Sequence, residues 1–202
     1  MHLSTIQTNR GDSRAAVKDA NDWVVLDAPD LSTLIRMTEW RTLAESALAD
    51  PSRTRIGNEA AAPAMILPLP SPAKVICCGL NYRDHIAETG RETPDYPTLF
   101  GKYADTLTGP RDSITIGSSA KVDWEAELAV VIGATVRSAT AAQARDAILG
   151  YTVANDVSMR DWQSRTLQWM QGKVWEQTTP LGPVIVTADA ISPTDGLAIR
   201  SL

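Results

Sequence analysis

The alternation of apolar and acidic residues within residues 122–133, VDWEAELAVVIG, most constrains how this chain can fold. Side chains of a strand point alternately to opposite faces. One face would carry four apolar residues: Ala126, Leu128, Val130 and Ile132. The other would begin with three carboxylates: Asp123, Glu125 and Glu127. Same-face neighbours lie only about 6–7 Å apart, and no Lys or Arg at 124, 126 or 128 relieves their repulsion.

Two environments can accommodate three carboxylates in a row. The acidic face can be solvated, in which case the segment is an ordinary amphipathic strand. Alternatively, a cation can lie against the face, since Mg²⁺ and Mn²⁺ prefer carboxylate oxygens with a few waters. Exposed Glu-x-Glu patterns are common, so this strand taken alone favours the solvated interpretation.

Length and charge exclude several classes of protein. The 202 residues suffice for one domain with a core, or one domain plus a small lobe. A net charge of −5 and a pI near 5.0 argue against a nucleic-acid surface. No apolar run approaches the length of a membrane span. The first residues, MHLSTIQTNRGDSR, contain no apolar signal-peptide core, so we expect a cytoplasmic protein.

The two cysteines, Cys77 and Cys78, are adjacent in an apolar run. Adjacent cysteines rarely form a disulfide with each other, and two residues do not make a zinc site. We expect reduced, buried thiols.

Residues 1–70 are expected to form a small N-terminal α/β lobe. Short strands are predicted at 2–8, 14–20 and 22–28, and apolar spacing predicts a helix over 31–50 that is weakest near Thr38. Residues 60–74, AAAPAMILPLPSPAK, contain four prolines, which mark a domain boundary. The main domain is predicted to cover residues 71–202.

In the main domain, strands are predicted at 74–80, 122–133, 151–158 and 180–191, and residues 197–202 alternate like a further strand. Residues 81–90 indicate one or two helical turns. Residues 138–150 predict a helix with a capping box of Thr140 and Gln143 and with Gly150 at its end. The order of elements predicts an α+β fold dominated by sheet.

A second acidic position follows an apolar strand in VANDVSMRDWQ. Asp156 is succeeded there by four further polar residues: Ser158, Arg160, Asp161 and Gln163. Polar residues crowded at a strand end are a common form of active site. The alternative is that Asp156 and Ser158 cap a helix, with a surface pair of Arg160 and Asp161.

A third candidate lies in NYRDHIAE, where His85 and Glu88 have the i, i+3 spacing of one helical face. A carboxylate beside an imidazole fixes its tautomer and raises its basicity, which suits a general base. A surface helical pair is the alternative.

Five segments occur in an order and spacing that resemble the fumarylacetoacetate hydrolase family, over residues 72 to about 200. They are ICCGLNYRDHIAETG, PTLFGK, VDWEAELAVVIG, GYTVANDVSMRDWQ and GKVWEQTTPLGPVIVT. The resemblance implies that family's sheet-rich α+β fold, roll-like or barrel-like, and within the family it points to acylpyruvate hydrolases with their isomerase and hydratase relatives. The family's closing C-terminal motifs do not follow, so we expect a truncated chain.

The resemblance also implies roles for individual residues. Glu125, Glu127 and Asp156 would bind one divalent ion, Mg²⁺ or Mn²⁺. The general base would be His85 with Glu88, and Lys173 would stabilise the oxyanion or the departing enolate. Arg160 and Gln163 would lie near substrate oxygens, whereas Asp161 would be structural and Asp123 would not be a ligand. Lys102, in LFGK, could touch a substrate carboxylate or lie on the surface.

The implied reaction is metal-dependent hydrolysis of the C–C bond of an acylpyruvate, such as fumarylpyruvate or maleylpyruvate, in aromatic-compound catabolism. The products would be pyruvate and a carboxylic acid. The alternatives are isomerisation of 2-hydroxyhepta-2,4-diene-1,7-dioate, decarboxylation of oxaloacetate, or an inactive fragment that serves as a binding module. The resemblance suggests a homodimer with a small oxo acid as substrate.

Overall fold

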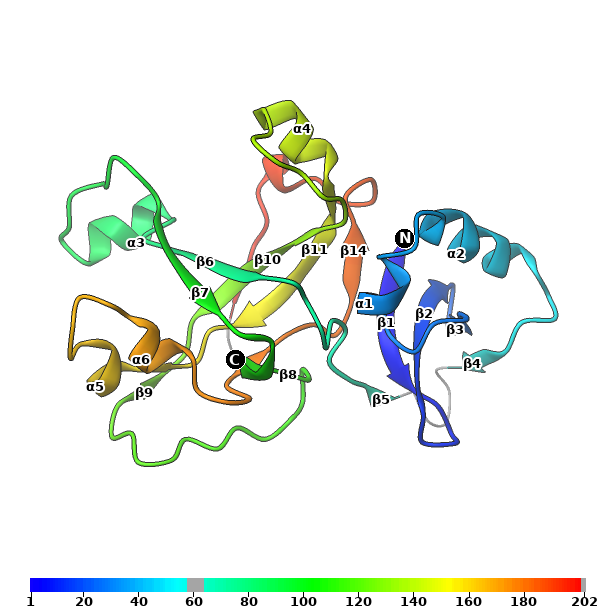
Figure 1. Ribbon diagram of the computed structural model, residues 1–202, viewed down its shortest axis with the longest axis horizontal. Coiled ribbons are helices and arrows are strands. Elements are labelled where there is room, and N and C mark those ends of the chain that lie inside the picture. The colour runs from blue at the N-terminus through cyan, green and yellow to red at the C-terminus, as the bar shows by residue number, and fades with distance from the viewer. Residues whose placement is uncertain (58–63, 201–202) are drawn as a thin grey trace.

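One large sheet runs through the chain, whose computed structural model describes residues 1–57 and 64–200 (Figure 1). Within those ranges its eight strands are β1 (His2–Gln7), β2 (Ser13–Asp19), β3 (Asp22–Val25), β4 (Arg55–Gly57), β5 (Ala64–Met65), β10 (Ala126–Ile132), β11 (Ile148–Asn155) and β14 (Ile185–Thr187). They pair in the order β10-β11-β14-β1-β2-β3-β4, with β5 beside β1. The antiparallel pair β1–β14 therefore joins the N-terminal strands to the rest of the sheet.

Two helices cover the N-terminal strands where the sequence predicts one. They are α1 (Leu31–Leu34) and α2 (Trp40–Ala49). The side chain of Asp30 caps α1 by accepting a hydrogen bond from the Thr33 N–H. The chain leaves the helical path after Ile35 and re-enters it at Trp40, so the weak spacing near Thr38 is a break between two helices.

The core is continuous across the predicted boundary near residue 70. Leu3 and Val24 of the N-terminal strands share one buried cluster with Leu149 and Ile185 of the later strands, and Leu69 belongs to it as well. A buried cluster of this kind ties the lobe to the main domain by apolar packing. The division into residues 1–70 and 71–202 stays a prediction, and residues 60–63 of the proline-rich segment lie outside the described residues.

Three small two-stranded sheets lie beside the large sheet in the described chain. They are β6 (Val75–Gly79) with β7 (Thr98–Lys102), β9 (Val122–Asp123) with β12 (Ser158–Met159), and β8 (Leu107–Thr108) with β13 (Thr179–Pro180). The remaining elements are α3 (Arg83–Glu88), η1 (Ala104–Thr106), α4 (Ala141–Asp146), α5 (Arg160–Gln163), α6 (Met170–Lys173) and η2 (Pro193–Asp195). The predicted sheet-rich α+β class is confirmed.

Two predicted elements are corrected. The capping box of Thr140 and Gln143 is present, but α4 ends at Asp146, and Ile148 and Gly150 belong to β11 instead. These residues adopt strand conformation because they pair with β10 and β14, although their local spacing is that of a helix. Residues 197–200 form no strand, and residues 201 and 202 lie outside the described ranges.

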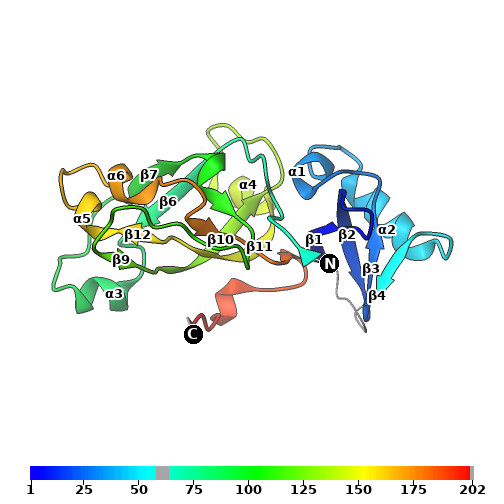
Figure 2. The ribbon, with the colours of Figure 1, turned by 90° about the horizontal axis from the view of Figure 1, so that it is seen from below.

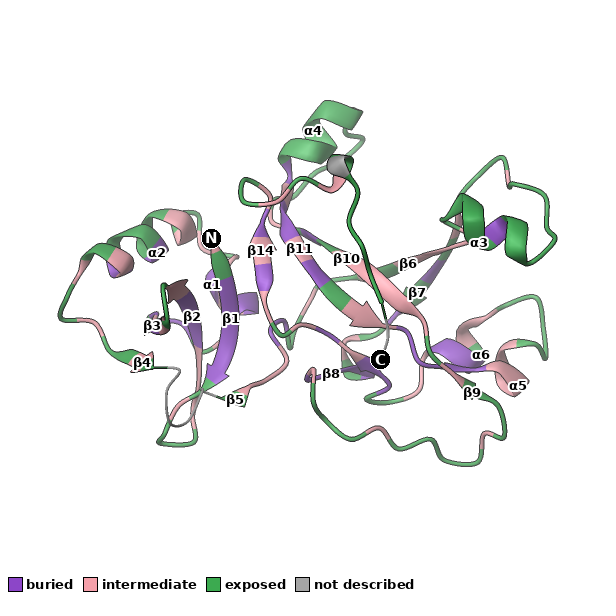
Figure 3. Cartoon of the chain, turned by 180° about the vertical axis from the view of Figure 1, so that it is seen from behind, coloured by how far each residue is buried: buried purple, intermediate pink, exposed green. Residues whose placement is uncertain are grey.

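The acidic strand is interrupted: β9 ends at Asp123 and β10 begins at Ala126, so Glu125 lies in the short link between them. The apolar face of β10 is the more exposed one, with Val130 at 48% and Ile132 at 52% exposure, whereas Val131 on the opposite face is buried. In Figure 3, β1 is mainly purple, whereas β10 is mainly pink, so β10 is the less buried of the two strands. Among the described residues, helices are too short or too polar to cross a membrane.

Candidate active site

The ends of β10 and β11 bring two of the predicted acidic residues together. Ala126 pairs with Asn155, so Glu125 and Asp156 are the next residues along the two strands. The Asp156 N–H donates to the Glu125 carbonyl oxygen at 3.0 Å, and the Glu125 N–H donates to Asn155 Oδ1 at 3.0 Å. These backbone bonds fix the two carboxylates as neighbours, although the residues are far apart in the sequence.

Lys173, at the end of α6, inserts its ammonium group between these carboxylates. Its Nζ lies 2.7 Å from Glu125 Oε1 and 3.2 Å from Asp156 Oδ2. The side chains of Lys173 and Asp156 are only 2% and 4% exposed. A buried charge is stable only when it is paired and hydrogen-bonded, and both conditions are met here. Lys173 thus lies at the acidic cluster, while its predicted role toward an oxyanion or enolate stays a prediction.

Glu127 completes an acidic cluster with Glu125 and Asp156. Burial, together with the charges of Glu125 and Asp156, raises the pKa of the Glu127 carboxyl to about 7, with Lys173 acting in the opposite direction. In the described part of the chain, no Lys or Arg forms an ion pair with Glu127. One carboxyl of the cluster therefore lacks a counter-charge.

Arg160 and Gln163, on α5, lie at the edge of the same cluster. Arg160 Nη1 lies 2.7 Å from Glu125 Oε1 and donates to Gln163 Oε1 at 2.8 Å, and its Nε donates to Asp123 Oδ2 at 2.8 Å. Asp161 turns away: it accepts hydrogen bonds from the Ser119 hydroxyl and the Ala120 N–H. Arg160 and Gln163 therefore border the acidic cluster, and their role toward substrate stays a prediction, whereas Asp161 holds the loop at Ser119 and Ala120.

Lys102 is the residue whose place the sequence left open, and the structure buries it. Its side chain is 0% exposed, and its ammonium forms an ion pair with Asp156 Oδ1. On β7 it shares a face with Phe100, whose ring packs edge-on against Trp169 with centroids 5.8 Å apart. In the sequence TLFGK, Lys102 lies two residues after Phe100, so on a strand both side chains would point to the same face. This spacing is the local signal for the position of Lys102, and it does not identify Asp156 as its partner.

His85 and Glu88 are not brought to the acidic cluster in this structure. Both lie on α3, with side chains 62% and 78% exposed, and His85 Nδ1 is 3.8 Å from Glu88 Oε2. Figures 1 and 2 show α3 apart from α5 and α6. Their pairing with each other follows the sequence, while their catalytic role stays a prediction.

Cys77 lies on β6 near the cluster. Burial raises the pKa of its thiol to about 11, and the nearby charges of Asp156 and Glu127 act in the same direction. A thiol with that pKa stays protonated at neutral pH and is a poor nucleophile. Both Cys77 and Cys78 are free, as expected, but they are only partly buried, so the expectation of buried thiols was wrong.

The cluster has the donor chemistry and the charge of a divalent-ion site, but among the residues that the structure describes it does not have the spacing of one. The donors are carboxylate oxygens, which Mg²⁺ and Mn²⁺ prefer. In the described chain, three cationic side chains lie among four carboxylates, and the carboxyl without a cationic partner is that of Glu127. The cations are Lys102, Arg160 and Lys173, and the carboxylates are Asp123, Glu125, Glu127 and Asp156. The spacing is nevertheless that of an ion-pair cluster: no three His, Cys, Asp or Glu side chains of the described ranges are close enough to hold a metal. The ammonium of Lys173 lies between the Glu125 and Asp156 carboxylates, and Lys102 pairs with the other oxygen of Asp156.

The chain is similar to curated proteins over most of its length. It is 40% identical over 191 residues to the mitochondrial oxaloacetate tautomerase fahd2 of Xenopus laevis, covering 91% of this chain and 60% of that protein. It is 42% identical over 137 residues to the human mitochondrial oxaloacetate tautomerase FAHD2A, covering 66% of this chain and 44% of the relative. The chain thus spans between about two fifths and three fifths of these relatives.

Solved structures share its fold. A fumarylacetoacetate hydrolase from Exiguobacterium antarcticum matches with a TM-score of 0.79 and 30% identity, covering 96% of this chain and 69% of that one. A maleylpyruvate hydrolase from Sphingobium sp. SYK-6, solved with manganese(II) and pyruvate, matches with a TM-score of 0.71 and 25% identity, covering 95% and 69%. The profile described as "Fumarylacetoacetate (FAA) hydrolase C-terminal" matches residues 74–202, and the chain belongs to the fumarylacetoacetate hydrolase family.

Proposed function

We propose that this chain carries the catalytic centre of a metal-dependent enzyme that enolises short 2-oxo acids, with tautomerisation of oxaloacetate as its reaction. The observation that carries the proposal is the buried ammonium of Lys173 between Glu125 and Asp156. Glu125, Glu127 and Asp156 would hold Mg²⁺ or Mn²⁺. The ion, when bound, would supply Lewis-acid stabilisation of negative charge on the substrate's carbonyl oxygen.

Lys173 is suited to stabilise charge on an enolate. Keto–enol exchange breaks a C–H bond next to the carbonyl, places the proton on a base, and returns a proton to the oxygen. A buried ammonium acts strongly on the developing oxyanion, because its surroundings screen charge less than water does. Arg160 and Gln163 would orient a substrate carboxylate. His85, paired with Glu88, remains the proposed base that accepts the carbon-bound proton.

Tautomerisation is preferred because two relatives of 40% and 42% identity are named oxaloacetate tautomerases. It also needs only proton transfer, whereas hydrolysis needs in addition a water directed at a second carbonyl group. Hydrolysis of an acylpyruvate is the second candidate, favoured by the structural match to a maleylpyruvate hydrolase solved with pyruvate. A cytoplasmic homodimer stays part of the proposal, although the curated relatives are named mitochondrial proteins.

The test is to add the chain with Mn²⁺ to freshly dissolved oxaloacetate and to follow loss of enol absorbance, with EDTA as the metal-free control. Faster exchange without pyruvate formation would support tautomerisation. Pyruvate from oxaloacetate would indicate decarboxylation, and pyruvate from maleylpyruvate or fumarylpyruvate would indicate hydrolysis. Mn²⁺ binding without turnover of any of these acids would contradict the proposal and favour a binding module.

A further inference from the structure

One face of the β10–β11 pair consists of apolar side chains, none of which is fully buried. Antiparallel pairing sets Leu128 opposite Val153 and Val130 opposite Tyr151, and residues directly opposite each other point to the same side of a sheet. Alternation along β10 adds Ile132 to this side. Val130, Ile132 and Val153 are 48%, 52% and 51% exposed. We call this surface the outer face, and it comprises Leu128, Val130, Ile132, Tyr151 and Val153.

The opposite face of the same two strands is occupied. Val131 is buried in the core cluster, and Ala129 and Ala154 pack against that cluster. Glu127, which points to the same side as Val131, belongs to the acidic cluster. Figure 2 shows β6 and β7 on one side of β10 and β11. The strand pair is thus packed on one side only, although both of its faces carry apolar residues.

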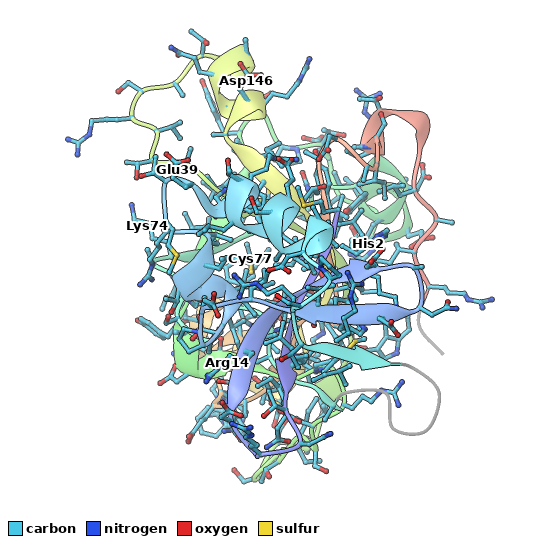
Figure 4. The ribbon with its side chains drawn as sticks, turned by 90° about the vertical axis from the view of Figure 1, so that its right-hand side faces the viewer. His2, Arg14, Glu39, Lys74, Cys77 and Asp146 are labelled. Atoms are coloured by element: carbon cyan, nitrogen blue, oxygen red, sulfur yellow. The ribbon has the colours of Figure 1, made fainter. Side chains whose placement is uncertain are left out.

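The outer face has no charged side chain. Exposed strands of monomeric proteins commonly carry charges, especially Lys, that discourage contact with another sheet. The charged residues labelled in Figure 4 lie on other elements, such as Asp146 on α4 and Glu39 just before α2. Two copies with a net charge of −5 each repel one another. An uncharged apolar face is therefore the surface through which two copies can approach most closely.

The accessible surface of the chain is larger than that of a compact monomer. It amounts to 12634 Å², whereas a compact monomer with a mass of 21.8 kDa is expected to expose about 9,300 Å². Each partner in a standard protein–protein interface buries only about 800 Å². Extended loops account for part of the excess, and what remains is sufficient for a stable interface.

We propose that the outer face is the interface of a two-fold symmetric homodimer, in which the outer faces of two copies pack against each other. A closed two-fold interface uses the same patch on both copies, and an apolar patch is complementary to itself. Residues 197–200 do not cover this surface, since Val130, Ile132 and Val153 stay about half exposed in their presence. The inference gives a location to the homodimer that the family resemblance suggests, and it does not depend on the proposed reaction.

The test compares Ile132→Lys with Ile116→Lys, the same substitution at a side chain of similar exposure, 44%, in the loop before β9. Sedimentation velocity over a range of protein concentrations gives the dimer dissociation constant of wild type and of both variants. Two-fold symmetry places both new ammonium groups in one apolar interface, so Ile132→Lys should raise this constant by about a hundredfold. Ile116→Lys should leave it unchanged. Both variants change the net charge equally, so general repulsion between copies cannot explain a difference.

Hydroxyl-radical footprinting of the wild-type chain completes the test and needs no variant to fold. Tyr151 and Val153 should become less reactive as rising concentration forms the dimer. A wild-type chain that is monomeric at every concentration, a dimer that Ile132→Lys does not weaken, or assembly without limit would each overturn the proposal. Protection of the outer face in a monomer would also overturn it and would show that the chain covers this face itself. The oxaloacetate assay tests the proposed reaction independently of these outcomes.

Discussion

The ammonium nitrogen of Lys173 lies 2.7 Å from Glu125 Oε1 in a side chain that is 2% exposed. Lys173 and a bound metal ion would therefore compete for the same carboxylate oxygen, Glu125 Oε1. The lysine is an internal counter-ion for this carboxylate, and it would have to yield part of the contact if the proposed ion bound. In the proposed metal centre, ion affinity and the stability of the ion-free chain would therefore be linked through this side chain.

Lys173→Met is expected to abolish turnover and to tighten Mn²⁺ binding by about tenfold, because a positive charge close to the metal is removed. Metal-free protein should become less stable, since the buried carboxylate of Asp156 and the partly buried one of Glu125 lose their shared partner. Calorimetric Mn²⁺ titration and thermal unfolding in EDTA measure the two effects. The exposed Lys121→Met is the matched control. Weaker Mn²⁺ binding in Lys173→Met would show that the lysine supports the metal site and does not compete with it.

Substitution by Gln should change the stability of the metal-free chain in opposite directions at Glu125 and at Glu127. Glu125 contacts Lys173 and Arg160, so Glu125→Gln should destabilise the metal-free chain by about 1–2 kcal/mol. Glu127 has a pKa raised to about 7, so ionising it at pH 8 costs free energy in the folded state. Glu127→Gln should therefore stabilise the metal-free chain at pH 8, by about 1 kcal/mol after allowance for its partial exposure.

Thermal unfolding in EDTA at pH 8 measures both variants, and Mn²⁺ titration should show weaker binding for each. A Glu127→Gln protein that is less stable than wild type would mean that this carboxyl already has a favourable partner, and its place in the proposed metal centre would be lost.

Sequence patterns identify the carboxylates of the acidic cluster better than the cationic side chains that pair with them. The periodicity around Glu125 and the strand before Asp156 are local features, and both residues were identified as candidate ligands from such patterns together with family motifs. The burial of Lys102 depends on the β6–β7 pairing and on a partner 54 residues away, and a window of sequence contains neither. Local patterns find the residues of a site, whereas long-range pairing decides which of them touch.

The same distinction explains the fold. The β1 and β2 strands are predicted within one residue of their observed ends, because Gly and Asp punctuate these short segments, and their consecutive central residues are buried in the sheet. Ile148 is predicted as helix because it continues the apolar spacing of α4, and Gly150 is predicted as the residue that ends this helix. Their strand conformation comes from pairing with Ile132 and Thr187.

The pair of Arg41 and Asp189 predicts an acid-sensitive contact between α2 and the turn after β14. The guanidinium of Arg41 donates to both Asp189 oxygens at 3.3 and 3.4 Å. Hydrogen bonding from Thr187 and from Arg41 holds the pKa of Asp189 well below its usual range. A lowered carboxyl pKa stabilises the folded state above the unfolded-state value, near 4, and this contribution is lost as the pH falls below it.

Asp189→Asn should thus cost up to about 1 kcal/mol at pH 7, the range for exposed ion pairs. The difference from wild type should shrink as the pH falls below about 4. Urea unfolding at pH 7, 5 and 3.5 measures it, with Asp84→Asn on the exposed α3 as the control for the same chemical change. A difference that does not vary with pH would assign the effect to packing.

Gly150 permits the junction of β11 with β14, on which the position of Asp156 depends. A Cβ atom at Gly150 would lie 2.2 Å from the Val186 carbonyl oxygen and 2.9 Å from Thr187 Cα, and neither backbone atom can move without breaking the sheet. Gly150→Ala should therefore destabilise the chain by about 1–3 kcal/mol, as overpacking does in protein interiors. Gly101→Ala is the matched control, since its nearest neighbour is 4.0 Å from the added atom. Urea unfolding of both variants measures the difference, and equal stabilities would show that β14 can shift away from β11 at little cost.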